Sequence, residues 1–184
     1  MILRKIHSSI AKIDLWILIK IFPFIFALHE FEEWNILSWH RKHQSNIPDV
    51  IDLHLRTIFV IIIVITFLFF LLVLRIKSKK IAAAILFPVF TFILYNGLVH
   101  LYWSIYFASY APGLVFGFIV GVPLIGIIIF KMISEKLIAK WYAALMGVIF
   151  IAIFAHIIAI GDKLESGIVS AMLLGKIIAE WIGL

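Results

Sequence analysis

Long runs of apolar residues, each bounded by a short polar or basic cluster, alternate along the chain. A helix needs about 20 consecutive apolar residues to cross the hydrocarbon core of a bilayer. Runs of this kind predict helices over about 14–34, 53–74, 81–106, 114–133 and 141–160. The pattern therefore predicts an all-α, polytopic membrane bundle of about five transmembrane helices, forming a single integral membrane domain over residues 1–184.

Two further segments have a mixed character. Residues 35–49 are polar and aromatic, and they predict an interfacial loop or a short surface helix with tryptophan at head-group level. Residues 166–184 are apolar, but Lys176 and Glu180 lie one helical turn apart, so their opposite charges share one face. This tail predicts an amphipathic C-terminal helix on the membrane surface, with a short sixth span as the alternative.

Composition agrees with a membrane protein and excludes several kinds of chemistry. Hydrophobic residues make up 65% of the chain, against about half in soluble domains. The absence of cysteine excludes disulfides, thiolate catalysis and cysteine-ligated metals. The net charge of +6 comes from lysines and arginines at the ends of apolar runs, so it indicates topology and contact with lipid head groups, not nucleic-acid binding.

Basic residues also set the expected orientation. With five spans, one side carries ten lysines and arginines and the other carries five. The larger set is Arg4, Lys5, Lys12, Arg75, Lys77, Lys79, Lys80, Lys131, Lys136 and Lys140. Because cytoplasmic loops are enriched in these residues, we expect a cytoplasmic N-terminus in a bacterial-type plasma membrane. The first apolar stretch has no small-residue cleavage site before Glu30, so it predicts a permanent span and not a signal peptide.

The fourth predicted helix carries a stripe of small residues. Gly113, Gly117 and Gly121 recur at every fourth position, which lets another helix approach closely. We expect this stripe to serve helix packing, within the chain or between copies in a homo-oligomer; a groove for a lipid-like chain is the alternative. Pro123 is expected to kink the helix just past the stripe.

Ionisable residues gather at the end of the first predicted helix. Such residues are costly inside a membrane, so each is a functional hypothesis. His29 and Glu33 share a helical face, and Glu32 flanks them. Glu30 is about 100° round the helix from His29 and points elsewhere.

Helical depth places a second group of polar residues at the same level. Asn96 and His100 lie one turn apart in the third predicted helix, and His156 stands alone in the fifth. At about 1.5 Å per residue, His29, His100 and His156 lie about 22, 28 and 22 Å from the starts of three helices that run in the same direction. We therefore expect all three histidines in the extracytoplasmic leaflet, with Tyr110 at the head of the fourth helix beside them.

Histidines and carboxylates that face one another across helices are typical of zinc or non-haem iron sites. The predicted metal ligands are His29, Glu33, His100 and, as a further ligand, His156. Glu32 is expected to act as a general base or another ligand, and Asn96 and Tyr110 are expected to position substrate. Zinc is the favoured metal and iron the alternative.

Three short motifs in this region occur in a fixed order. Residues 29–33 read H-x-x-E-E, residues 96–100 read N-x-x-x-H, and residues 110–113 read Y-x-P-G. Together they resemble the HXXEE-domain family of small integral membrane proteins. The resemblance implies a set of functional positions but no particular reaction, and His156 is not among them: His29, Glu32, Glu33, Asn96, His100, Tyr110, Pro112 and Gly113.

The function that these observations favour is a membrane-embedded, metal-dependent enzyme that acts on a lipophilic substrate such as a lipid or an isoprenoid, most simply by hydrolysis. A metal-free isomerase that moves a proton with glutamate and histidine is the first alternative. A carrier for a small ligand or ion is the second, although no inverted repeat of the transporter kind is visible in the sequence.

Overall fold

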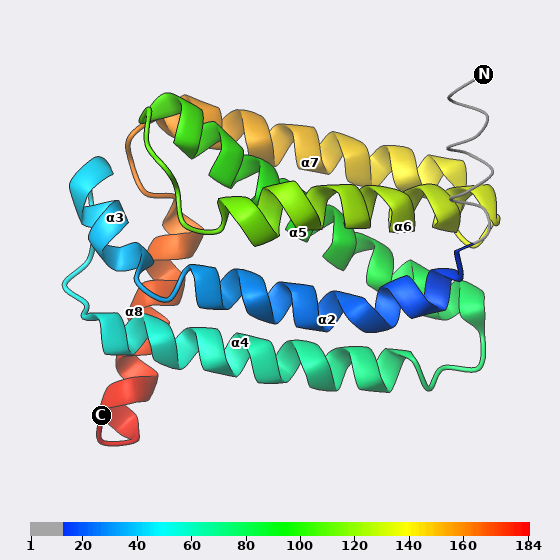
Figure 1. The fold of residues 1–184 in the computed structure, drawn as a ribbon, viewed down its shortest axis with the longest axis horizontal. Helices are drawn as coiled ribbons and strands as arrows, with labels where there is room; N and C mark the ends of the chain where they lie inside the picture. Colours follow the sequence, from blue (N-terminus) through cyan, green and yellow to red (C-terminus); the bar gives the residue numbers. More distant parts are fainter. Residues whose placement is uncertain (1–12) are drawn as a thin grey trace.

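The computed structural model describes residues 13–184, and their regular structure is helical (Figure 1). No β-strand occurs among them, only one isolated bridge between Ser45 and Lys163. Arg4, Lys5 and Lys12, which contribute to the predicted orientation, lie outside the described residues. The helices are α2 (Leu15–Glu32), α3 (Ile36–His43), α4 (Asp52–Val73), α5 (Lys79–Tyr106), η1 (Leu114–Gly121), α6 (Val122–Ser134), α7 (Lys140–Ile160) and α8 (Ser166–Trp181).

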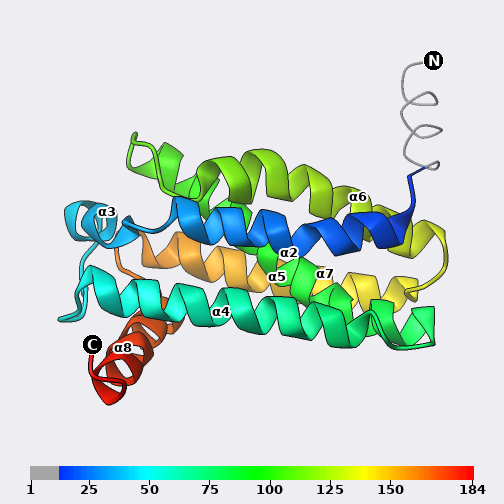
Figure 2. The ribbon, with the colours of Figure 1, turned by 60° about the horizontal axis from the view of Figure 1, so that its bottom comes forward.

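The long helices form one bundle. Helices α2, α4, α5, α6 and α7 run side by side along the long axis, and η1 continues directly into α6 (Figure 1). Helix α5 packs against η1, α6 and α7, and α2 packs against η1 and α4. The short helix α3 and the C-terminal helix α8 both lie at one end of the bundle (Figure 2).

Four helices are long and apolar enough to cross a membrane. They are α4, α5, α7 and the continuous helix formed by η1 and α6. Helix α2 has 18 residues and carries Lys20, Glu30 and Glu32, so its charge sets it apart from these four. The all-α membrane bundle that the sequence predicts is thus present, and a fifth span through α2 remains a prediction.

Helix α8 has the length and the position expected of a surface helix. It has 16 residues, short of the roughly 20 that a span needs, and it crosses the end of the bundle instead of extending it (Figure 1). Its N-terminus is tied down because the side chain of Asn46 pairs with the backbone of Leu164 through bonds of 2.8 and 3.1 Å. Lys176 donates to the backbone oxygen of Asp49 at 3.0 Å, so the charged face of α8 holds the segment before α4.

Local sequence signals fix several helix ends. The Asp14 carboxylate accepts from the backbone N–H of Trp16 and Ile17 and so caps the start of α2, which is the usual work of aspartate at this position. Helix α5 ends where Ala108 adopts a left-handed φ of 46°. The N–H of Ser109 then bonds the carbonyl of Ser104 at 3.2 Å, which closes the last turn in the manner of a Schellman motif.

Aromatic rings fill the centre of the bundle between α2, α4 and α5. Phe22 lies 5.5 Å from Phe70 and 5.0 Å from Phe90, measured between ring centroids. All three rings are almost completely buried. Within a bilayer, such contacts stabilise the fold through close packing, because lipid is as apolar as the core.

The segment 114–121 differs from the single α-helix that the sequence predicts. It forms the π-helix η1, and Gly113 at its N-terminus has a φ of 90°. Pro123 lies in the first turn of α6, within the continuous helix that η1 and α6 form. Every residue of 114–121 is apolar or glycine, so periodicity could not distinguish the wider π turn from an α turn.

Candidate metal centre

The end of α2 presents two polar side chains on one face. His29 lies in the last turn, and Glu33 is the residue that ends the helix, with its N–H bonded to the His29 carbonyl at 3.1 Å. Helical geometry is therefore kept up to Glu33, and residues one turn apart remain neighbours. The Nε2 atom of His29 lies 3.0 Å from Oε1 of Glu33.

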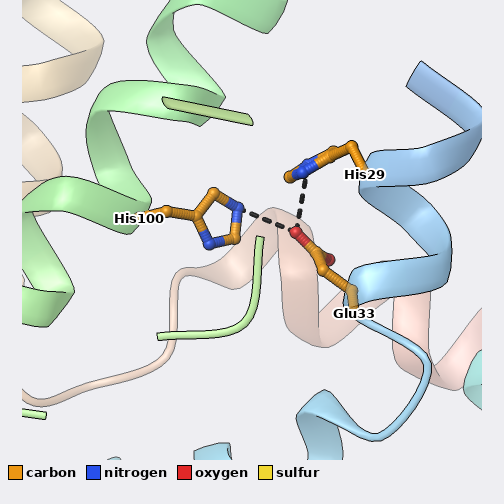
Figure 3. Close-up of side chains that lie close together, drawn as sticks. All are labelled: His29, Glu33 and His100. Carbon is orange, nitrogen blue, oxygen red and sulfur yellow. Dashed lines mark ion pairs between the residues drawn. The ribbon is translucent and has the colours of Figure 1, made fainter. Parts of the chain in front are cut away.

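Helix α5 supplies the third side chain. The Nε2 atom of His100 lies 2.8 Å from the same Oε1 atom of Glu33, so both imidazoles point at one carboxylate oxygen (Figure 3). The two imidazole rings are 5.0 Å apart and nearly perpendicular. His29 and His100 are each 2% exposed and Glu33 is 8% exposed, so the group is closed off from its surroundings.

Several polar atoms of this group lack hydrogen-bond partners among the described residues. They are both ring nitrogens of His29, Nδ1 of His100 and Oε1 of Glu33. The short contacts thus bring ring nitrogens and a carboxylate oxygen together without forming well-aligned hydrogen bonds. A buried polar atom left unsatisfied costs about 1–3 kcal/mol, and a cation between the three side chains would satisfy two of these atoms, Nε2 of His29 and Oε1 of Glu33. One ligand atom from each residue lies within 4.8 Å of the others, so the group can hold a metal ion.

Two glycines of the predicted stripe form the wall of this site. A Cβ atom on Gly113 would lie 2.6 Å from Oε1 of Glu33 and 2.6 Å from Cε1 of His100. A Cβ atom on Gly117 would lie 2.9 Å from Cε1 of His29. The stripe therefore serves close packing within the chain, and the packing partners are the candidate ligands themselves.

The Glu32 carboxylate binds the N-terminus of η1. It accepts the backbone N–H groups of Val115 at 2.9 Å and Phe116 at 2.8 Å. It also accepts the hydroxyl of Tyr110. A negative charge at a helix N-terminus is favoured by the helix dipole and by the free N–H groups there. Glu32 thus links α2 to the turn that carries Gly113.

Tyr110 is exposed and donates its hydroxyl to Glu32. Partial burial and this hydrogen bond raise the pKa of Tyr110 to about 12. The phenol therefore stays protonated at neutral pH and can donate continuously to the carboxylate.

Two of the predicted site residues lie apart from the three buried ligands. Asn96 lies one turn before His100 on α5 and is half-buried, and its side chain makes no hydrogen bond to a described residue. His156 is exposed on α7 and is not part of the group that can hold a metal ion. Depth fixes the level of a residue along its helix but not the direction in which its side chain points, and the depth argument for His156 used only the level.

Residues 20–129 match the family model described as a protein of unknown function with HXXEE motif. This match spans more than half of the chain and contains all three buried ligands. The chain belongs to the HXXEE family. No curated protein and no solved structure matches it. In this HXXEE protein, the motif supplies two of the three candidate ligands, His29 and Glu33, and also Glu32, which binds the N-terminus of η1.

One acidic residue of the HXXEE motif was not assigned a role from the sequence. Glu30 is 6% exposed and forms no hydrogen bond with a described residue. The sequence did carry a signal that Glu30 is unusual. It lies within an apolar helix, and carboxylates are rarely buried there without a partner. This chain thus carries a buried acid at the first variable position of the motif, next to His29 in the sequence.

An apolar cleft adjoins His29. Its walls come from Phe22, Ile25 and Phe26 of α2, Ile93 of α5, and Phe116 of η1, and the space between them has room for about one water molecule. Gly117 and Gly121 complete the lining, and their lack of side chains helps to make the space. The cleft runs inward along α2 from the buried histidine, so it offers an apolar surface next to the polar group.

Proposed function

We propose that this HXXEE protein is a membrane-embedded, metal-dependent enzyme that acts on a lipophilic substrate, with hydrolysis as the favoured reaction. The observation that supports it best is the convergence of three buried ligand atoms from His29, Glu33 and His100 within 4.8 Å. We also propose a bacterial-type plasma membrane with a cytoplasmic N-terminus, which places this site in the extracytoplasmic leaflet.

The ligand set suits zinc and also suits iron. Two histidines and one glutamate are a known catalytic zinc set that leaves one position open, and two histidines with one carboxylate also hold non-haem iron. Ligand atoms of a tetrahedral zinc ion lie about 3.3 Å apart, and those of an octahedral ion lie about 3.0 Å apart. Oε1 of Glu33 lies 3.0 and 2.8 Å from the two histidine nitrogens, close to both values, and all three ligand atoms lie within 4.8 Å of one another. We favour zinc.

The roles of the chain follow from these contacts. His29, Glu33 and His100 would hold the metal, which when bound would supply a Lewis acid and an activated water. Asn96, with an unused amide one turn from His100, would orient the polar group of the substrate. Glu32 and Tyr110 would keep η1 seated against the site. The apolar cleft beside His29 would have to widen, by movement of its aromatic walls, to accept the hydrocarbon part of a substrate that enters from the bilayer.

Elemental analysis of the purified, detergent-solubilised protein tests the proposal. We expect close to one zinc or iron atom per chain, removed by a strong chelator and restored by adding the ion back. His29→Ala and His100→Ala should each lose the metal, while the exposed His156→Ala should keep it. Wild-type protein that binds no metal under these conditions would overturn the proposal.

A metal-free acid–base enzyme, such as an isomerase of a lipid-like substrate, is the second candidate. The specific observation in its favour is that both imidazoles lie at hydrogen-bond distance from one carboxylate oxygen, 2.8 and 3.0 Å. Such an arrangement can pass a proton between two positions on a substrate. A metal-free enzyme must stay active after the protein is washed with chelator. A carrier would instead show ligand flux into vesicles without chemical turnover.

A further inference from the structure

A serine and a histidine meet outside the candidate metal centre. The hydroxyl of Ser109, in the turn after α5, lies 3.2 Å from Nε2 of His43, the last residue of α3. The two residues are 66 positions apart in the chain, so the fold and not local sequence brings them together. Neither belongs to the group of His29, Glu33 and His100.

A third group orients the histidine. Nδ1 of His43 lies 2.9 Å from the backbone carbonyl oxygen of Trp39. A carbonyl oxygen can only accept, so Nδ1 must carry the proton and donate it. Nε2 then presents its lone pair, and the Ser109 hydroxyl donates to it. Ser109, His43 and the Trp39 carbonyl thus take the places of nucleophile, general base and orienting acceptor, which is the arrangement that activates a serine hydroxyl.

The surroundings of the pair suit an acceptor group of a ligand. Ser109 and His43 are only half-buried, so the hydroxyl can be reached. The buried side-chain nitrogens Trp39 Nε1 and Gln44 Nε2 have no hydrogen-bond partner among the described residues. Trp39 packs on His43 with ring centroids 4.7 Å apart, and Gln44 directly follows His43. Unused N–H donors are the kind of group that binds a developing oxyanion, and both of these belong to residues that adjoin His43.

The location points to the class of substrate. The pair lies at the end of the bundle that holds α3 and α8 (Figure 1), where the sequence predicts the membrane interface. The rings of Trp39 and Phe107 flank His43, and tryptophan favours head-group level. Carboxylic esters of membrane lipids lie at this level, between the hydrocarbon and the polar head groups.

We propose that Ser109 is a nucleophile activated by His43 and that it cleaves carboxylic esters of lipids at this interface. Ser109 Oγ forms a bond to the ester carbonyl carbon, and its proton passes to Nε2 of His43. The bond from that carbon to the alcohol oxygen then breaks, and the alcohol leaves with the proton from His43. Water next attacks the acyl-serine, gives its proton to His43, and releases the acid while Ser109 regains its hydroxyl proton.

This site is separate from the proposed metal centre, and its chemistry needs no metal. A fluorophosphonate probe reacts with activated serines and not with ordinary hydroxyls, so it reports directly on the proposal. The full-length protein in detergent is treated with the probe, and peptides are analysed by mass spectrometry. We expect an adduct on Ser109 that forms at the same rate before and after chelation.

Matched variants separate activation from mere contact. Ser109→Ala should lose the adduct. His43→Gln keeps a side chain that can accept from the hydroxyl but removes the base, so labelling should slow by about 10²–10⁴-fold. Ser38→Ala is the control, because the exposed Ser38 hydroxyl donates to the backbone oxygen of Asn35 at 2.9 Å and has no histidine partner.

Two outcomes would overturn the assignment. In the wild type, an adduct absent from Ser109, or formed there no faster than on Ser38, means that the hydroxyl is not activated. An equal labelling rate in a folded His43→Gln variant means that the hydrogen bond only ties the turn to α3. The wild-type comparison of Ser109 with Ser38 decides the matter even if a variant does not fold.

Discussion

The neighbouring carboxylates of Glu32 and Glu33 point to different partners. Glu33 faces the two buried imidazoles at 2.8 and 3.0 Å, while Glu32 accepts two backbone N–H groups of η1 and the hydroxyl of Tyr110. Successive residues of a helix differ by about 100° in direction, so one turn of chain serves two separate tasks. Glu32 and Glu33 are therefore expected to respond differently to the same substitution.

Glutamine at each position tests this division. Glu33→Gln should lose bound metal, because a neutral amide is a poor ligand beside two histidines. Glu32→Gln should keep the metal but destabilise the fold, since hydrogen bonds to a charged group contribute about 1.5–3 kcal/mol each. Metal content and SDS-induced unfolding of both variants provide the measurement. Loss of metal from a folded Glu32→Gln protein would instead favour Glu32 as a ligand.

Alanine at Gly117 tests the close contact between η1 and His29. The added methyl would lie 2.9 Å from the imidazole, so the ring must move or the helices must separate, at a cost of about 1–3 kcal/mol. We expect both a lower unfolding midpoint and weaker metal binding.

Gly126→Ala is the matched control for that substitution. A Cβ atom on Gly126 would meet no atom within 4 Å, and alanine favours a helix by about 1 kcal/mol over glycine. This variant should therefore be as stable as the wild type or slightly more stable, with unchanged metal binding. If both alanine variants behave alike, the contact between Gly117 and His29 has no energetic role.

The sequence predicted the helices well because its signals are local. Apolar runs with basic ends locate the spans within a few residues, and caps such as Asp14 mark where a helix begins. It could not predict η1, since an unbroken apolar stretch contains no information about whether a turn holds an extra residue. The charges of α2 also leave its status as a span to experiment.

The site was predictable where two residues share a helix and less so between helices. His29 and Glu33 are one turn apart, so their pairing follows from helical geometry. The meeting with His100 depended on helix direction and depth, and the structure shows those side chains together. The same depth argument did not establish the orientation of His156, which is exposed. The contact of His43 with Ser109 joins the end of α3 to the turn after α5, and no periodic pattern in the sequence predicts such a contact.

Cysteine labelling in intact cells tests the orientation. The chain has no native cysteine, so Ser45→Cys and Lys77→Cys each introduce a single thiol, and both positions are exposed. Ser45 lies between α3 and α4, and Lys77 lies at the opposite end of α4. A membrane-impermeant maleimide should label the cysteine at 45 and spare the one at 77 until the cells are opened. The reverse result would place the candidate metal centre in the cytoplasmic leaflet.

Acid should destabilise the fold through His40. This side chain is 2% exposed and pairs with Gln44 through Nδ1. Burial lowers the pKa of His40 from 6.5 to about 4, and the hydrogen bond to Gln44 only partly opposes the shift. The unfolded chain therefore takes up a proton at a higher pH than the folded chain does. The contribution of neutral His40 is complete above pH 6.5 and is lost as the pH falls toward 4, by about 1.4 kcal/mol per pH unit.

Replacing His40 with phenylalanine isolates this effect. Phenylalanine keeps a ring against Trp103, which lies 5.4 Å from the His40 ring, but it cannot be protonated. Unfolding of the wild type and of His40→Phe is measured between pH 4.5 and 7.5. The variant should be less sensitive to acid because one titrating group has gone, even if it is less stable at neutral pH through the lost bond to Gln44. Parallel pH profiles would mean that His40 becomes protonated as easily in the folded protein as in the unfolded chain.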